Sequence, residues 1–237
     1  MKSLLEKIKS ISHLPIDFQF DASKIEREIR ELPFPLMQYN ANKQSEHAYS
    51  DSGWNNLALF SESGSIFCDC NEASGGEKFL SSFGKFQKTG LSEYMPYTYE
   101  ILESLSAGKS MARIEEVHPN TIIGWHSHVL EFSQPEDILI VQLPIVIPEE
   151  FKYSVIDYVE YRSFDFSKDK IKQYDFKYTV GIPYIFNSYH YHNVFNFGSN
   201  PALMIRFFVK LEDIEELVER SLEQYSGDLI VGCLNNK

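Results

Sequence analysis

The chain has 237 residues, of which 43% are hydrophobic and 14% aromatic, enough apolar material for a sizeable buried core. Its 22 basic and 34 acidic residues give a formal net charge of −12, so we expect its surface to repel nucleic-acid phosphates and predict no nucleic-acid partner. The longest apolar run, Ile138 to Pro148, is too short to cross a bilayer, and the charged start of the sequence lacks a secretory signal. We therefore expect a cytoplasmic protein with no membrane association.

Residues 1–110 are expected to form a layer that supports the rest of the fold. Apolar residues recur at helical spacing over the first dozen residues, which predicts an amphipathic helix. Ser23, followed three residues later by Glu26, predicts the start of a second helix. The elements predicted here are helices over residues 1–12, 23–32 and 97–105, a strand over residues 54–60 and a loop over residues 71–88.

From residue 111 to residue 210, apolar, aromatic and β-branched residues dominate, in segments separated by turn clusters. The predicted strands span residues 111–117, 137–147, 151–166, 178–186, 189–195 and 202–209. Strands that follow one another without intervening helices favour an antiparallel sandwich or barrel. We predict a single domain over residues 1–237, mainly β with flanking helices. Its core is a double-stranded β-helix, a jelly-roll or cupin-like barrel over residues 111–210, with an N-terminal helical layer. Residues 211–237 are expected to add a C-terminal helix and tail.

Four histidines of the β-rich half form two His-x-His pairs, His126 with His128 and His190 with His192. Alternate residues of a strand face the same side, so each pair is expected to present two imidazoles to one surface. Imidazole nitrogens that converge inside a barrel suit a transition metal. The residues alone leave three interpretations open: a catalytic metal site, a structural zinc site, or histidines satisfied by hydrogen bonds.

The motifs around these histidines follow one another in a definite order. In the chain they are the strand, turn and strand from Ala112 to His126, the apolar strand Ile138 to Pro144, the segment Phe186 to Gly198 that contains His192, and Arg206 within Ile205 to Val209. This ordering resembles the aspartyl/asparaginyl β-hydroxylase family of iron(II)- and 2-oxoglutarate-dependent oxygenases. The resemblance covers roughly Trp54 to Glu212.

The resemblance implies roles for individual residues. His126 matches the first iron ligand of the family and His192 the distal one, and Arg206 would hold the C5 carboxylate of 2-oxoglutarate. His128 stands where the wider superfamily has a carboxylate, and is a candidate third metal ligand. Gln142 stands where the family has a basic residue that binds the oxoacid. The family's arginine lies nearer to the distal histidine than Arg206 does, and an insertion in the preceding turn would account for the difference.

The resemblance thus implies an enzyme, a non-haem Fe(II), 2-oxoglutarate-dependent dioxygenase. With O₂ it would hydroxylate a C–H bond of an amino acid, a peptide side chain or a small metabolite. A second resemblance, to cupins, rests on His126-x-His128 with nearby Glu131 and on His192-x-x-x-Asn196, and implies the same barrel. Two alternatives stay open: a cupin-type three-histidine metal dioxygenase without an oxoacid, and a non-catalytic metal-binding β-barrel module.

Overall fold

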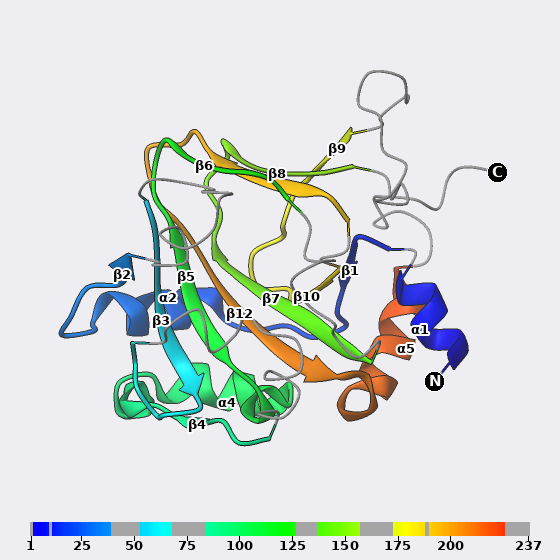
Figure 1. Cartoon of the computed structure of the whole chain (residues 1–237), viewed down its shortest axis with the longest axis horizontal. Coiled ribbons are helices and arrows are strands. Elements are labelled where there is room, and N and C mark those ends of the chain that lie inside the picture. Colours follow the sequence, from blue (N-terminus) through cyan, green and yellow to red (C-terminus); the bar gives the residue numbers. More distant parts are fainter. Residues whose placement is uncertain are drawn as a thin grey trace.

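Two antiparallel sheets face each other in the computed structural model of the chain (Figure 1). The structure describes residues 2–9, 11–38, 53–67, 84–126, 137–156, 173–187 and 190–225. Among these residues, no helix is both long enough and apolar enough to span a bilayer.

Eight consecutive strands, β5 to β12, are divided between the two sheets. They are β5 Ala112–Val117, β6 Thr121–His126, β7 Ile138–Val146, β8 Phe151–Ile156, β9 Gln173–Phe176, β10 Tyr184–Phe186, β11 His192–Asn196 and β12 Ala202–Lys210. The larger sheet contains the order β10-β7-β12-β5, and the smaller sheet has the order β6-β11-β8-β9. Every pairing between these neighbours is antiparallel. This arrangement is the predicted double-stranded β-helix, so the fold prediction is confirmed.

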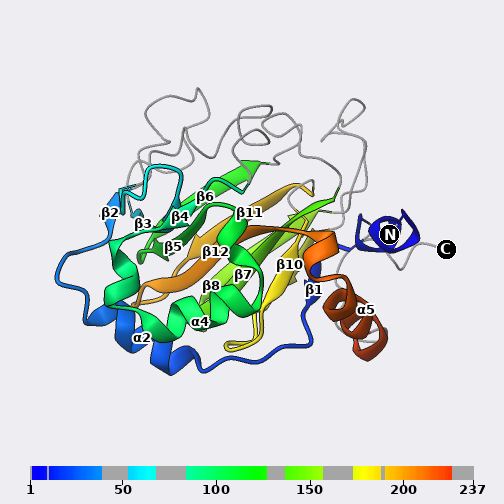
Figure 2. The same cartoon turned by 90° about the horizontal axis from the view of Figure 1, so that it is seen from below.

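The N-terminal part adds strands to the larger sheet and helices to its outer face. Its elements are α1 Lys2–Lys9, β1 His13–Pro15, α2 Ala22–Arg30, β2 Met37–Gln38, β3 Trp54–Ser61, β4 Gln87–Lys88, η3 Gly90–Glu93, α4 Pro96–Ser104 and η4 Ala107–Lys109. β1 extends the sheet beyond β10, and β3 extends it beyond β5, with β2 and β4 paired to β3. Helix α2 packs on β7 and against α4, and Figure 2 shows both helices lying across the larger sheet. The supporting layer therefore contains more strands than the single one predicted over residues 54–60.

The C-terminal elements pack against the beginning of the chain. β12 continues into η6 Leu211–Asp213 and α5 Glu215–Gln224, and α5 lies beside α1 at one end of the barrel (Figures 1 and 2). The Ser221 hydroxyl accepts a hydrogen bond from the Asp17 backbone N–H at 2.8 Å, and Arg220 pairs with the Asp17 carboxylate at 3.2 Å. These contacts connect α5 to the segment that follows β1.

The two central strands of the larger sheet, β7 and β12, are buried along nearly their whole length. Helices cover one face of this sheet and the smaller sheet covers the other, so both faces favour apolar residues. Two polar residues interrupt the apolar runs, Gln142 in β7 and Arg206 in β12, and the register places them directly opposite each other. Opposite residues share a face of the sheet, so these two form a polar pair.

Helix α2 begins slightly earlier than predicted because Asp21, and not Ser23, caps it. The Asp21 carboxylate accepts hydrogen bonds from the backbone N–H groups of Ser23 and Lys24. The Ser23 hydroxyl donates to the same carboxylate at 2.6 Å, and this bond is the main reason that the pKa of Asp21 is lowered. Aspartate and serine are both good N-caps, and the sequence pattern alone favours the wrong one of the two.

Two predicted strands are shorter in the structure. β10 starts at Tyr184 because the chain turns at Gly181, whose φ of +85° lies in the left-handed region that favours glycine. β11 starts at His192, so His190 precedes the strand. Residues 157–166 of one predicted strand and most of the predicted loop over residues 71–88 lie outside the described residues.

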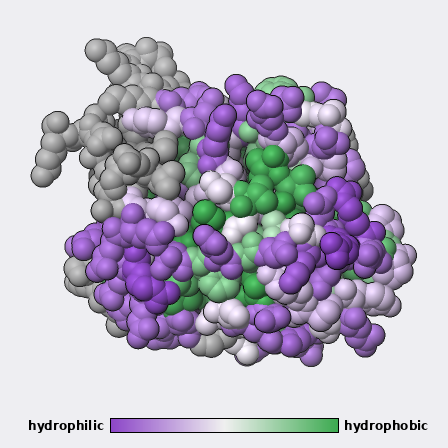
Figure 3. All heavy atoms as spheres, turned by 180° about the vertical axis from the view of Figure 1, so that it is seen from behind, coloured by the Kyte–Doolittle hydropathy of each residue, from purple (hydrophilic) through white to green (hydrophobic). Residues whose placement is uncertain are grey.

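The rear face of the molecule, opposite to the view of Figure 1, is not uniformly polar. Apolar side chains gather in its middle and hydrophilic side chains surround them (Figure 3). Most other apolar side chains of the described residues pack in one continuous core between the two sheets and under α2 and α4.

Candidate active site

A small cavity of about 20 Å³ lies between the two sheets. Its lining residues are Trp54, Glu115, Val117, Ile123, Phe151, Tyr153, His192, Val194, Met204 and Arg206. The volume is about that of one water molecule. The cavity brings together His192 and Arg206, two of the residues that the sequence singles out.

His192 is held in one orientation at the wall of this cavity. Its side chain is buried, and its Nδ1 lies 2.7 Å from the backbone carbonyl oxygen of His190. A carbonyl can only accept, so Nδ1 carries the proton and Nε2 keeps its lone pair. The ring also stacks on Tyr153 at 5.7 Å between centroids and contacts the edge of Phe186 at 4.8 Å. Metal-binding histidines show the same pattern, in which a hydrogen bond at one nitrogen orients the other toward the metal.

A β-bulge brings the backbone of His126 opposite His192. Strands β6 and β11 pair Ile123 with Val194 and His126 with His192, so β6 contains one extra residue between these pairs. In continuous register, Trp125 would lie opposite His192. Directly opposite residues of an antiparallel pair have Cα atoms about 4.5–5.5 Å apart and share a face of the sheet. Bulges are common next to active sites, where they redirect the chain.

The other predicted histidines have different places. His128 lies outside the described residues. His190 lies in the bend before β11, so the argument from alternate strand residues does not extend to it. His118 lies in the β5–β6 turn, with its Nε2 2.6 Å from the Glu116 carboxylate and 2.9 Å from the Asn55 amide. Within the described part of the chain, no three His, Cys, Asp or Glu side chains come together as a metal site.

Arg206 takes part in a buried ionic cluster next to the cavity. The Glu115 carboxylate lies 3.3 Å from Nη2 of Arg206 and 2.6 Å from Nε of Arg113. Arg206 also lies directly opposite Arg113 in the register of β12 and β5. The Nε of Arg206 is buried and, among the described residues, has no hydrogen-bond partner. A buried donor of this kind favours an acceptor, and a ligand carboxylate is suited to the role.

Two further hydrogen-bond donors accompany this guanidinium. The Oε1 of Gln142 accepts a hydrogen bond from the Tyr178 hydroxyl, which leaves the amide Nε2 as a donor. Within the described ranges, neither this Nε2 nor the hydroxyl of Tyr153 has a partner at full hydrogen-bond geometry, and both are buried, although Gln142 lies close enough to the Tyr153 hydroxyl to lower its pKa slightly against the effect of burial. Burial raises the pKa of Tyr153 well above its usual value against the effect of the Arg206 charge, so the hydroxyl keeps its proton. Arg206, Gln142 and Tyr153 therefore provide three buried donors that can bind an acceptor on this side of the barrel.

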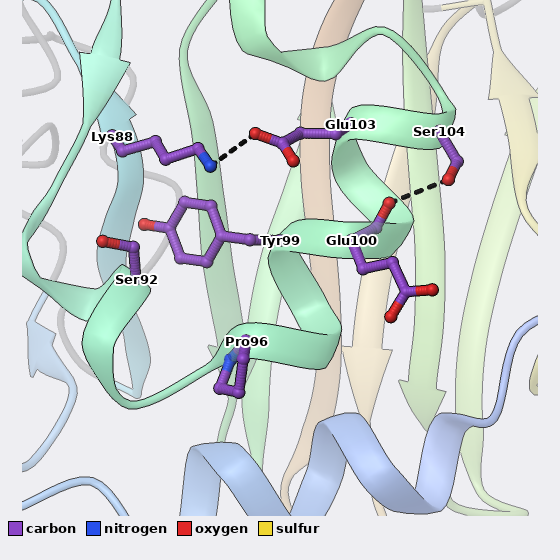
Figure 4. Close-up of a pocket in the computed structure, with 7 residues that line it drawn as sticks. All are labelled: Lys88, Ser92, Pro96, Tyr99, Glu100, Glu103 and Ser104. Atoms are coloured by element: carbon purple, nitrogen blue, oxygen red, sulfur yellow. Dashed lines mark hydrogen bonds and ion pairs between the residues drawn. The ribbon is translucent and has the colours of Figure 1, made fainter.

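A second hollow, of about 590 Å³, is open to solvent between η3 and α4 (Figure 4). It is lined by Lys88, Ser92, Pro96, Tyr99, Glu100, Glu103 and Ser104. Lys88 Nζ pairs with the Glu103 carboxylate at 2.5 Å, and both side chains are about half exposed. Exposed ion pairs contribute little stability, and none of the predicted site residues lies here. The cavity between the sheets is therefore the candidate active site.

Glu115, Tyr153 and Tyr178 are not among the site residues predicted from the sequence. Glu115 carries a usable signal, because a charged residue in a strand that is buried on both faces needs a partner. The tyrosines carry no such signal, since aromatic residues are common on strands whether or not they contact a ligand.

Comparison with protein families identifies the chain. A model described as aspartyl/asparaginyl β-hydroxylase matches residues 19–209. The chain belongs to this family. The aspartyl/asparaginyl β-hydroxylase match starts well before Trp54, so it includes α2 and strands β2 to β4 as well as the barrel, but not β1.

Several solved structures are similar to this hydroxylase-family chain at low sequence identity. An oxidoreductase of the 2OG-Fe(II) oxygenase family from Burkholderia pseudomallei is 12% identical, with a TM-score of 0.52 over 87% of this chain and 89% of its own. A prolyl-4-hydroxylase from Pseudomonas putida is 9% identical, with a TM-score of 0.42 over 88% of this chain and 97% of its own. The first likeness shows a shared fold. No curated protein sequence matches the chain.

Proposed function

We propose that the chain is a non-haem Fe(II), 2-oxoglutarate-dependent dioxygenase that hydroxylates a C–H bond of an amino acid, a peptide side chain or a small metabolite. One observation carries the proposal. The imidazole of His192, oriented through His190, lines the same cavity as the guanidinium of Arg206, and the backbone of His126 lies opposite His192.

The histidines would hold the iron. His192 offers Nε2, because its Nδ1 proton is engaged by the His190 carbonyl. His126 is the proposed second ligand, because the register places it on the same face of the smaller sheet. His128 is proposed as the third ligand, in place of a carboxylate. Neutral imidazoles suit Fe(II) and leave coordination positions for an oxoacid and O₂.

The donors beside Arg206 would hold 2-oxoglutarate. Its distal carboxylate complements the Nε–H of Arg206 and the amide of Gln142, which faces Arg206 across β7 and β12. The cavity accommodates about one water molecule, so an oxoacid must displace lining side chains. Met204 is one of these, and its unbranched side chain adapts readily to a new neighbour.

When bound, the iron and the oxoacid supply the oxidative chemistry. The residues of the chain orient the metal-binding imidazole and keep water out of the site. The hydrogen bond to His190 fixes the tautomer of His192, and the ring of Tyr153 fixes the plane of its imidazole. The apolar residues of β7 and β12 exclude water from the interior, which strengthens the contacts of Arg206 with an anion.

Iron content and 2-oxoglutarate turnover test the proposal. The wild-type protein is expected to bind one Fe(II) and to convert 2-oxoglutarate to succinate, and His192→Ala or His126→Ala should lose most of the iron. His118→Ala is the matched control, because His118 is bonded to Glu116 away from the cavity. Full iron occupancy in both ligand variants would contradict the metal site. Iron binding without any use of 2-oxoglutarate would favour the cupin-type dioxygenase or the non-catalytic metal-binding module, and no metal binding would contradict the metal site.

A further inference from the structure

A buried chain of hydrogen bonds leads from the N-terminal strand to the proposed carboxylate site. It starts at β1, which pairs with β10 at the edge of the larger sheet. His13 of this strand is fully buried, with Nδ1 3.3 Å from the Ser12 hydroxyl and Nε2 3.2 Å from the Tyr178 hydroxyl. The Tyr178 hydroxyl in turn contacts Oε1 of Gln142.

The hydrogen bonds between His13, Tyr178 and Gln142 are all donated in the same direction, toward Gln142. The amide oxygen of Gln142 can only accept, so Tyr178 donates to it, and the Tyr178 oxygen then accepts from Nε2–H of His13. Burial is the main cause that lowers the pKa of His13, so the ring is neutral and its Nδ1 accepts from Ser12. In this direction the proton of His13 lies on Nε2; a reversed Gln142 amide requires the other tautomer of His13, in which Tyr178 donates to Nε2 and accepts from the amide.

Aromatic side chains pack around His13 and hold its ring in place within this series of hydrogen bonds. The His13 ring stacks on Phe176 at 4.0 Å between centroids, and the rings of Tyr153 and Tyr178 meet it edge-on at 5.0 and 5.6 Å. Tyr153 also stacks on His192, so the cluster connects β1 to the proposed iron ligand as well as to Gln142.

We propose that His13 and Tyr178 are positioning residues, which fix the Gln142 amide with its N–H donors toward the carboxylate site beside Arg206. This inference rests on the proposed function, because the ligand is the distal carboxylate of 2-oxoglutarate. His13, in a short N-terminal strand outside the eight strands of the barrel, thereby determines the orientation of the Gln142 amide inside the barrel. Without the Tyr178 hydroxyl, the amide is free to turn its oxygen toward the carboxylate, which weakens binding.

The test is a double-mutant cycle on 2-oxoglutarate affinity, measured by calorimetry with Mn(II) in place of iron so that no turnover occurs. Tyr178→Phe is expected to raise the Kd about ten-fold, the effect of one hydrogen bond to a charged group. Gln142→Leu should raise it at least as much. Because Tyr178 acts through Gln142, adding Tyr178→Phe to Gln142→Leu should cause no further loss.

Two variants separate positioning from general damage to the cluster. Tyr184→Phe removes another hydroxyl, which accepts from the Thr179 backbone N–H, and keeps the ring that packs edge-on against Tyr178. It should leave the Kd unchanged. His13→Phe keeps an aromatic ring on Phe176 but removes the donor to Tyr178, and it should raise the Kd by about two- to five-fold, less than Tyr178→Phe.

The outcomes distinguish the inference from the function on which it rests. Independent, additive losses in the double variant, or an unchanged Kd in Tyr178→Phe while Arg206→Lys weakens binding, would overturn the positioning role alone. If the wild-type protein did not bind 2-oxoglutarate with Mn(II), the proposed co-substrate and the positioning role would both fail.

Discussion

Arg206 is the residue whose surroundings bear most directly on the co-substrate. Its contact with Glu115 satisfies one Nη group, and the Nε remains available to another acceptor within the described residues. The ion pair and the oxoacid are therefore compatible, because they use different nitrogens of the same guanidinium.

Arg206→Lys is expected to weaken 2-oxoglutarate binding by at least ten-fold while iron binding stays unchanged. Lysine keeps the charge next to Glu115 but cannot offer two parallel N–H groups. Calorimetry measures the affinity, and metal analysis of the same sample checks the iron. Lys210→Arg, at an exposed ion pair with Glu212, serves as the control. An unchanged affinity in Arg206→Lys would remove the anchoring role.

At this scale the sequence pointed to His192, Arg206 and Gln142, and the structure places all three in or beside the barrel interior. The sequence did not show that Glu115 lies between Arg206 and Arg113, because contacts between neighbouring strands depend on their register. Register is set by bulges and turns that composition does not show.

At the scale of elements, two helices under the larger sheet are joined by one side chain. The carboxylate of Glu28, in α2, accepts hydrogen bonds from the backbone N–H groups of Tyr97 and Thr98 at 2.8 and 2.9 Å and from the Thr98 hydroxyl at 2.6 Å. It thus caps the N-terminus of α4, where Met95 provides no side-chain cap.

Glu28→Ala should therefore lower the free energy of unfolding by about 1–2 kcal/mol, the usual cost of losing a cap. Glu26→Ala, on the same helix, is the control. Among the described residues, Glu26 forms an ion pair with Arg30 one turn on, and the loss of such a largely exposed pair should cost about 0.3–0.5 kcal/mol. Urea denaturation of both variants measures the difference. Equal losses in the two would contradict a capping role for Glu28.

The elements differ in how far the sequence predicts them. β7 and β12 match their predicted ranges closely, because a long apolar run has few alternatives inside a two-layer fold. The bulge in β6 that brings His126 opposite His192 was not predictable, since it depends on pairing with a strand about seventy residues later in the chain. β1 was also missed, because three residues are too few to show a strand period.

At the scale of the whole molecule, the buried His13 makes folding sensitive to pH. Burial, and then the nearby His190, lowers its pKa well below 6.5, whereas in the unfolded chain it titrates near 6.5. The other groups facing it are the hydroxyls of Tyr153 and Tyr178, and burial keeps both protonated. As the pH falls below about 6.5, the unfolded state takes up a proton that the folded state does not, and stability falls.

His13→Phe should remove this sensitivity. Between pH 7 and pH 5.5, the wild-type protein is expected to lose about 1 kcal/mol more unfolding free energy than the variant, the effect of one histidine. Urea denaturation at the two pH values measures the difference, which cancels the titration of groups common to both proteins. A parallel dependence on pH in both proteins would contradict the buried, neutral state of His13.

The overall architecture was predictable because a run of strands without helices leaves few compact arrangements, and the double-stranded β-helix is one of them. Among the N-terminal strands, β3 matches the strand predicted over residues 54–60, whereas β1 was missed. The place of either strand in the larger sheet was not predictable, because their pairing partners lie far along the chain.

Diffraction from anaerobic crystals with Fe(II) and 2-oxoglutarate, with data at the iron absorption edge, tests the proposed iron and carboxylate sites together. We expect one iron about 2.1 Å from Nε2 of His192 and from a nitrogen of His126, with a ligand carboxylate hydrogen-bonded to Nε of Arg206. A His128 nitrogen at the same distance would establish the third ligand, and one beyond about 3 Å would exclude it. Iron elsewhere in the molecule would contradict the proposed metal site, and a carboxylate away from Arg206 would contradict the proposed 2-oxoglutarate site.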